Sequence, residues 1–387
     1  MTLMAEPFPA RITQSLAETP AQATGVALIR LGALRRNYRK LRDLAAPAET
    51  AAVVKANAYG LGAAGAFRVL QAEGCRTAFV ATPSEAQELR GIFPQPAIYA
   101  LSGLLPGTAP LFEEAAARPV LSSLDEVAEW AAYCKGRGKP LPAAVHIDTG
   151  MSRLGLPEAQ TRQLARMPEL LSAFSLCLIV SHLVCGDEAD NSKNEEQLAL
   201  FAALTSLFPG VPRSLANSAG ILLGPRFHFD LTRPGIGLYG GRPNAGGTNP
   251  MEPVLWLFGR AVEVAWAEAG QTVGYSATQA LKRRTRIATV AAGYADGYFR
   301  AASSSDGREG AAAYAGEYRL PLLGRVSMDL LTFDATDAPE EAVRRGGFIE
   351  LLGARVTVDD LAERAGTIGY EVLTSLGRRY HRVYVDE

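Results

Sequence analysis

The sequence has almost no excess of charge, few cysteines and no long apolar run. Its formal net charge is −1, which argues against a nucleic-acid partner because such proteins present a basic surface. No stretch approaches the roughly 20 apolar residues that span a bilayer, and residues 1–25 lack the basic start and apolar core of a secretory signal. We therefore expect a soluble protein without a nucleic-acid or membrane partner, behind a poorly ordered leader over residues 1–25.

The cysteines show neither close pairing nor the spacing of metal ligands. Thiols scattered in this way are typical of free cysteines in a reducing compartment, so we expect a cytoplasmic location. The four are Cys75, Cys134, Cys177 and Cys185.

Lysine is also scarce, because arginine supplies most of the positive charge. Only six lysines occur, and Lys55 alone stands at the end of a strand-like apolar run, residues 51–54. A lysine is rarely buried unless its charge is paired or its chemistry is used. Desolvation at such a position lowers the lysine pKa and permits a Schiff base with a carbonyl cofactor. The alternative is a strand-end lysine whose ammonium reaches solvent.

Short apolar runs alternate with helix-like stretches from about residue 28 to residue 240. Eight strands in such alternation fit a (β/α)8 (TIM) barrel, although a doubly wound sheet shares the periodicity. We expect the strands at residues 51–54, 77–80, 97–100, 119–121, 143–147, 176–180, 214–216 and 230–232. The intervening helices are expected at residues 32–45, 63–73, 83–90, 124–135, 157–167 and 191–207.

From about residue 252 the pattern changes to short β-like runs separated by Gly, Pro and Asp. We expect strands at residues 258–264, 285–292, 318–323, 330–334, 348–351 and 355–358, with helices only at 359–365 and 370–376. The chain is also long enough for two domains. We predict a barrel domain over residues 26–250 and a mainly β domain over residues 251–387.

Polar residues follow the expected barrel strands. In a (β/α)8 barrel these C-terminal strand ends converge on one face and form the site. The positions are Lys55, Tyr59, His146, Asp148, Arg153, His182, Asn217, Ser218 and Arg233. Packing does not explain such a set at the ends of apolar runs, so we predict a functional site there.

Two Gly-containing turns follow the last two expected strands, at residues 218–220 and 234–237. Small residues let backbone N–H groups approach an anion, and the last two loops of such barrels are a recurrent phosphate site. Beside Lys55 they favour a phosphorylated carbonyl cofactor over two ordinary turns. A zinc or iron site on the two histidines and Asp148 is a chemical alternative, but it leaves the lysine and the turns unexplained.

Residues 51–62, AAVVKANAYGLG, resemble the pyridoxal phosphate attachment motif of alanine racemases. Eight further segments resemble signatures of the same family, in family order and over both domains. They are 148–155 (DTGMSRLG), 181–183 (SHL), 216–220 (ANSAG), 233–240 (RPGIGLYG), 274–278 (GYSAT), 293–298 (GYADGY), 324–329 (GRVSMD) and 366–372 (GTIGYEV). We therefore identify the chain as a suspected member of the family.

The resemblance implies an N-terminal (β/α)8 barrel, a C-terminal β domain and a head-to-tail homodimer. The strand near residues 26–31 would pack with the β domain. The implied activity is interconversion of L- and D-alanine with pyridoxal 5′-phosphate (PLP), supplying D-alanine for peptidoglycan. A broad-specificity or serine racemase is the first alternative. A PLP homeostasis protein or a decarboxylase is the second, although homeostasis proteins lack the β domain.

By resemblance, two bases act on opposite faces of the substrate. Inversion needs a proton removed from one face and another delivered to the other, and a single base would tend to return the proton it took. Lys55 would serve the D-antipode, and Tyr275 of the partner's β domain the L-antipode. A free tyrosine with a pKa of about 10 is a poor base near neutrality. His182 would help lower that pKa through Arg233.

Arg233 matches the family arginine that faces the cofactor's pyridine nitrogen. A guanidinium does not readily give up its proton, so the nitrogen should stay unprotonated and side reactions such as transamination should be limited. Decarboxylases on the same barrel place a carboxylate there. This position therefore favours a racemase.

The remaining matches concern binding. Those for cofactor binding are Tyr59, His182, Asn217, Ser218, Gly235, Ile236 and Tyr370, in addition to Lys55 and Arg233. Those for substrate binding are Arg153, Tyr294, Met328 and Asp329, and those at the substrate entrance are Asp187, Arg300 and Arg325.

One position departs from the family pattern. Many members carry a lysine, often carbamylated, where this chain has His146, and the carbamate charge orients the arginine equivalent to Arg153. Histidine cannot supply that charge. We expect Arg153 to be held by an anion such as chloride, by a nearby carboxylate or by neutral His146.

Overall fold

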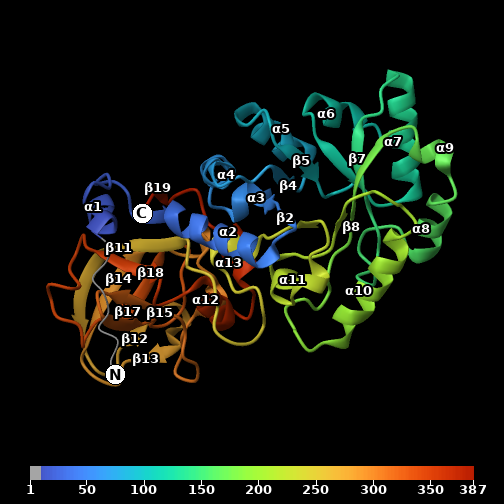
Figure 1. Cartoon of the computed structure of the whole chain (residues 1–387). Coiled ribbons are helices and arrows are strands. Elements are labelled where there is room, and N and C mark those ends of the chain that lie inside the picture. Colours follow the sequence, from blue (N-terminus) through green and yellow to red (C-terminus); the bar gives the residue numbers. More distant parts are fainter. Residues whose placement is uncertain (1–9) are drawn as a thin grey trace. The chain divides into compact units, whose positions relative to one another are not determined.

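The computed structural model describes residues 10–387, which form two compact units (Figure 1). The barrel unit comprises Leu34–Leu238 and Arg242–Met251. The β unit comprises the N-terminal segment that ends at Ala33, with Tyr239–Gly241 and Glu252–Glu387. Of the helices within residues 10–387, none has the length and apolarity needed to cross a bilayer.

The strands of the barrel unit are parallel and form a closed ring. They are β2 (Glu49–Thr50), β3 (Ala52–Val53), β4 (Thr77–Val80), β5 (Ala97–Ala100), β6 (Arg118–Leu121), β7 (Pro142–His146), β8 (Ser175–Val180), β9 (Arg213–Ser214) and β10 (Leu231–Thr232). Strands β3 to β9 pair in chain order, and β10 pairs with β2. The amides of Ala51 and Arg233 donate to the carbonyls of Thr232 (2.9 Å) and Ala216 (2.8 Å), which closes the ring. The expected barrel is confirmed and the doubly wound sheet is excluded.

The helices around the barrel begin and end where the sequence supplies caps. Thr82 accepts a hydrogen bond from the Glu85 amide (3.3 Å), and Ser123 accepts one from the Glu126 amide (3.1 Å). Gly138 ends one helix in the left-handed conformation. The helices are α2 (Leu31–Ala45), α4 (Ala63–Ala72), α5 (Pro83–Ile92), α6 (Ala109–Glu114), α7 (Leu124–Arg137), α8 (Glu158–Leu164), α9 (Pro168–Leu171), α10 (Ser192–Thr205) and α11 (Ser218–Leu222).

The β unit contains one large mixed sheet. Its strands are β1 (Gly25–Arg30), β11 (Leu255–Ala267), β14 (Thr285–Ala291), β15 (Ala312–Ala315), β16 (Tyr318–Pro321), β17 (Leu330–Asp334), β18 (Phe348–Leu352) and β19 (His381–Val385), with the helices α12 (Val358–Ala365) and α13 (Gly369–Thr374) beside it. Strand β1 covers almost the residues expected to pack with the β domain. It pairs antiparallel with β11 and parallel with β19.

Residues 10–17 differ from the expected leader because they form the helix α1 (Ala10–Ala17). Ile12 is fully buried, and Leu16 packs against the same apolar cluster. The other buried members are Val26, Leu28, Trp256, Phe258 and Val385. Burial of the apolar side of α1 outweighs the Pro, Ala and Thr content that suggested poor order. Residues 1–9 of the expected leader lie outside the described residues.

The strand expected at residues 355–358 is wrong. Val358 begins α12, and Thr357 is its N-cap. The Thr357 amide donates to the Asp360 carboxylate (2.7 Å), and the Asp360 amide donates back to the Thr357 hydroxyl (3.2 Å). This capping box outweighs the β-branched residues of the run.

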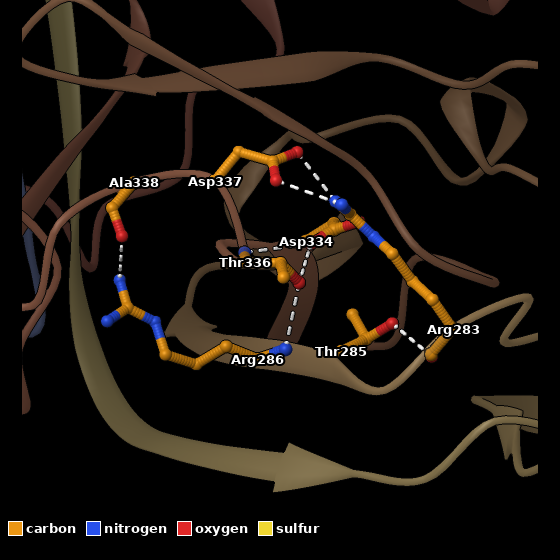
Figure 2. Close-up of polar contacts among 7 residues, drawn as sticks. All are labelled: Arg283, Thr285, Arg286, Asp334, Thr336, Asp337 and Ala338. Carbon is orange, nitrogen blue, oxygen red and sulfur yellow. Dashed lines mark hydrogen bonds and ion pairs between the residues drawn. The ribbon is translucent and has the colours of Figure 1, made fainter.

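One connection of the β unit is fixed by side chains that bond backbone groups (Figure 2). Arg286 of β14 donates its amide to the Thr336 hydroxyl (3.0 Å) and its guanidinium to the Ala338 carbonyl (2.8 Å). Arg283 pairs with Asp337 (2.6 Å) and Asp334 (3.4 Å). The loop after β17 is thereby held against the start of β14.

Candidate active site

Lys55 lies two residues beyond the end of β3 and opens a left-handed turn, which we define as residues 56–59. The φ angles of Ala56, Asn57, Ala58 and Tyr59 lie between 51° and 54°. Each such residue costs about 1–2 kcal/mol relative to the right-handed form. Strain of this kind persists where the surroundings over-determine it, and it clusters at functional sites. The sequence does not reveal the turn, because residues 56–59 include no glycine.

Hydrogen bonds hold both ends of the left-handed turn. At its start, the Ala56 amide donates to a Glu85 carboxylate oxygen (2.7 Å). At its end, the Gly60 amide donates to the Ala56 carbonyl (2.8 Å), and the Asn57 side chain accepts from the Ala63 amide (2.8 Å). These contacts fix the backbone from which the Lys55 side chain projects.

The electrostatic surroundings of Lys55 favour its neutral amine. Burial lowers the pKa of Lys55, and the positive charge of Arg153 lowers it further, while Glu85 opposes both. A neutral amine is the form that attacks a carbonyl and that accepts a proton.

Tyr59, Ser218 and Gly235 meet beyond the C-terminal ends of the strands. A Cβ atom at Gly235 would lie 2.3 Å from the Tyr59 hydroxyl, so only glycine fits beneath that side chain. The Ser218 hydroxyl accepts from the amides of Gly235 (2.9 Å) and Gly237 (3.1 Å). Asn217 caps α11 by accepting from the Gly220 amide (2.9 Å). The two predicted Gly-containing turns thus lie against each other, with backbone amides gathered around one hydroxyl.

Arg233 lies in the interior of the barrel and is only 5% exposed. Its guanidinium donates to the carbonyls of Ser214 (2.8 Å) and Ser181 (2.6 Å) and to the Ser214 hydroxyl (2.5 Å). The Ser214 hydroxyl itself donates to the Leu231 carbonyl (2.5 Å), which orients its lone pairs toward the arginine. Within residues 10–387 no carboxylate pairs with Arg233.

Burial lowers the pKa of Arg233 to about 10, so it stays protonated at neutral pH. The guanidinium carbon lies 5.8 Å from the centroid of the Phe79 ring, which stacks on Tyr99 at 4.9 Å. These aromatic faces stabilise a cation without neutralising it. The barrel interior therefore holds a fixed positive charge whose position is set by three acceptors.

His146 and His182 are both neutral at neutral pH. Burial lowers the pKa of His182 to about 3 and that of His146 to about 4, and the charge of Arg233 is the next cause in each case. Within residues 10–387 no three His, Cys, Asp or Glu side chains converge as a metal site requires. Instead the Asp148 carboxylate accepts from the amides of Gly150 (2.9 Å), Met151 (2.9 Å) and Ser152 (3.2 Å). Asp148 therefore organises a turn.

The turn made by Asp148 carries Arg153. A Cβ atom at Gly155 would lie 2.7 Å from the Asp148 amide and 3.0 Å from the His146 ring, so this close approach needs glycine. Arg153 is exposed, and in the described part of the chain no carboxylate pairs with it. Neutral His146 lies within electrostatic range of Arg153.

The fully buried Gln197 of α10 is a residue that sequence reasoning missed. Its amide donates to the Thr149 hydroxyl (3.0 Å) and to the His182 carbonyl (2.9 Å), and its oxygen accepts from the Val184 amide (2.8 Å). Gln197 thus joins the loops that follow β7 and β8. A glutamine inside a helix is common, so the sequence gives no signal of this role.

The β unit brings together other predicted residues on two adjoining loops. The Tyr294 amide donates to the Ser327 carbonyl, and the Ala295 amide to the Met328 carbonyl, each at 3.0 Å. Arg379 pairs with Asp296 (2.6 Å) and with Asp329 (2.6 Å) and so joins the loops. Tyr294, Met328 and Asp329 are therefore held as one group.

The predicted residues of the β unit are largely exposed. Tyr275 is 69% exposed, in the short 3-10 helix η3 (Tyr275–Ala277), and Met328 is 52% exposed. Tyr370 lies in α13 and is 37% exposed. The β unit therefore presents aromatic and thioether side chains to its surroundings.

Comparison with known proteins covers nearly the whole chain. The profile "Alanine racemase, N-terminal domain" matches residues 29–243, and "Alanine racemase, C-terminal domain" matches residues 254–384. The alanine racemase of Methylobacterium sp. (strain 4-46) is 48% identical over 358 residues, which are 92% of this chain and 97% of that protein. A protein of Agrobacterium fabrum named "Alanine racemase, catabolic" is 45% identical over 94% of this chain and 92% of its own length.

Solved structures point to the same family as the sequence comparisons. The alanine racemase of Bartonella henselae, solved with covalently bound pyridoxal phosphate, superimposes with a TM-score of 0.88 at 37% identity over 94% of this chain and 100% of that one. The biosynthetic alanine racemase of Pseudomonas aeruginosa gives 0.87 at 35% identity, with the same shares covered. The chain belongs to the alanine racemase family.

Proposed function

We propose that this chain is an alanine racemase that interconverts L- and D-alanine with PLP as its cofactor. The observation that carries the proposal is the position of Lys55, two residues beyond β3 at the start of a strained turn. The same barrel holds Arg233, whose buried charge is paired with no carboxylate among residues 10–387. Relatives that are 48% and 45% identical bear the name alanine racemase. A related structure holds PLP covalently.

The residues of the barrel fit the cofactor. Lys55 would hold its carbonyl carbon covalently, and Arg233 would donate to the pyridine nitrogen. The turn beneath Tyr59, where a Cβ atom at Gly235 has no room, gathers backbone amides around the Ser218 hydroxyl. Backbone amides gathered in this way are typical of anion sites. The phosphate would be held by Tyr59, Ser218, the amides of Gly235 and Ile236, and Tyr370, with Asn217 shaping the turn and His182 beside the ring.

PLP, when bound, withdraws electrons from the substrate's α-carbon and so makes its hydrogen acidic. Lys55 then accepts or donates the proton on the D-face, and burial keeps its amine available for this. Tyr275 does the same on the L-face. The fixed charge of Arg233 favours an unprotonated ring nitrogen, which suppresses side reactions.

We further propose that each active site is composite, in a cytoplasmic head-to-tail homodimer. The barrel domain of residues 26–250 would supply Lys55, and the β domain of residues 251–387 of the partner would supply Tyr275, Met328 and Asp329. The exposure of Tyr275 and Met328 supports this, since a proton-transfer site works when water is excluded from it. Arg153 would hold the substrate carboxylate, with Tyr294 beside it and Asp187, Arg300 and Arg325 at the entrance.

The reaction would supply D-alanine for peptidoglycan. Relatives carry both names, biosynthetic in Pseudomonas aeruginosa and catabolic in Agrobacterium fabrum. Chiral chromatography of L-alanine incubated with the protein and PLP, with L-serine in parallel, tests the activity. Convergence of alanine to equal antipodes well ahead of serine supports the proposal. Faster serine conversion favours the broad-specificity or serine racemase, and no conversion with PLP bound contradicts the activity.

A further inference from the structure

We propose that Glu85 is a positioning residue for Lys55, because its carboxylate fixes the first residue of the left-handed turn. One carboxylate oxygen accepts from the Ala56 amide (2.7 Å) and the other from the Ala81 amide (2.7 Å). Ala56 directly follows Lys55, and Ala81 directly follows β4. A single carboxylate thus joins the C-terminal ends of two neighbouring barrel strands. The inference rests on the proposed role of Lys55 in binding the cofactor.

The helix α5 holds Glu85 ready for this contact. Its backbone is fixed in the first helical turn, since its amide donates to the Thr82 hydroxyl (3.3 Å) and Pro83 begins the helix. From there the carboxylate reaches back across the helix start. The cap and the carboxylate contacts use different atoms, so the contacts can be removed while the cap remains.

The turn needs an external partner at its start. None of residues 56–59 is glycine, and of the four only Asn57 readily adopts positive φ, so the local sequence alone does not select this conformation. Gly60 and Asn57 secure the far end, where the backbone leaves toward α4. At the near end the structure provides the Glu85 carboxylate, and charged acceptors make the stronger hydrogen bonds.

The charge of Glu85 also acts on Lys55. It raises the Lys55 pKa against the lowering by burial and by Arg153. Removing the charge therefore lowers the pKa of the Lys55 amine. A residue that merely stabilises α5 would leave both the turn and the lysine unaffected.

The test compares Glu85→Gln with Glu88→Gln, an exposed glutamate on the same helix. Glutamine keeps one acceptor and turns the other into a donor, so one of the two amide contacts is lost. In the cofactor-free protein, we expect hydrogen exchange at the Ala56 or Ala81 amide to rise about tenfold in Glu85→Gln, with α5 protection unchanged. Glu88→Gln should match the wild type. Equal exchange at both amides in all three proteins overturns the proposal.

In the PLP-loaded enzyme, Glu85→Gln should lower kcat about tenfold or more with a smaller change in KM, because the reacting amine is displaced. With D-alanine as substrate Lys55 must be neutral to accept the proton, so its amine sets the acid limb of the pH profile, and this limb should shift to lower pH. PLP should still be fixed to Lys55 by borohydride reduction, as mass spectrometry of the peptide shows. An unchanged profile and kcat overturn the proposal. Failure to label Lys55 in the wild type would instead contradict the proposed cofactor site, while leaving the exchange result interpretable.

Discussion

The two units present their candidate site residues in opposite ways. In the barrel, Arg233 is 5% exposed and Ser218 2% exposed, and each is held by several hydrogen bonds. In the β unit, Tyr275 is 69% exposed and Met328 52% exposed. A buried charge and a strained turn are positioned by their own unit, whereas an exposed base needs another surface to exclude water around it. The proposed site, assembled from two subunits, requires this difference.

The means of positioning also differ. The barrel uses backbone strain and buried carbonyl acceptors, as at the left-handed turn and at Arg233. The β unit uses close backbone approach and a partly exposed ion-pair bridge through Arg379. Exposed ion pairs contribute little each, so the loops of the β unit should adjust more easily.

The largest effect should come from Lys55→Ala, which removes the covalent attachment and one base. We expect racemisation to fall by about 10³-fold or more. Borohydride reduction should no longer fix PLP to the chain. Lys135→Ala, an exposed lysine on α7, is the control and should behave as the wild type. Undiminished turnover in Lys55→Ala would contradict the assignment of Lys55 as the attachment residue and base of the barrel.

Gly235→Ala should weaken PLP binding about tenfold or more, because the new methyl displaces the Tyr59 hydroxyl from the turn. Gly246→Ala is a matched control, since a Cβ atom there meets no atom within 4 Å. PLP affinity is measured by titration of the cofactor-free protein. Equal affinities in the two variants would show that the Tyr59 contact plays no part in binding.

Gln197→Leu should destabilise the barrel by about 2–4 kcal/mol, because the partly buried Val184 amide and His182 carbonyl and the buried Thr149 hydroxyl all lose their hydrogen-bond partner. Denaturant unfolding measures the loss. Gln163→Leu, exposed on α8, should change stability little. A Gln197 variant as stable as the control would mean that the loops after β7 and β8 do not depend on this amide.

The smallest effect concerns pH. Burial lowers the pKa of His146 from its ordinary value of 6.5 to about 4, so between these values the unfolded chain binds more protons. Stability from this group is complete above pH 6.5 and falls as the pH drops toward 4, by up to about 3 kcal/mol. His146→Gln should flatten the dependence of Tm on pH in this window. The same slope in both proteins would contradict the burial of a neutral His146.

The sequence predicts the barrel well because each strand is a short apolar run that ends in polar residues. Even so, Arg355–Val358 was expected as a strand, since β-branched residues there conceal a capping box. Lys55, Ser218 and Arg233 could be found from their strand-end positions. Glu85, Gln197 and Ser214 could not, because their roles depend on hydrogen bonds between residues far apart in the chain.

The central claim is that each unit supplies one of the two bases, Lys55 or Tyr275. The most direct test follows the α-hydrogen of each alanine antipode by NMR in D2O with the variant Tyr275→Phe. Tyr384→Phe, exposed on β19, is the control. We expect the Tyr275 variant to keep PLP and to exchange the α-hydrogen of D-alanine through Lys55. Exchange of L-alanine and racemisation should fall by about 10²–10⁴-fold. Equal loss for both antipodes, or unchanged racemisation, would contradict the assignment of the two bases to opposite faces.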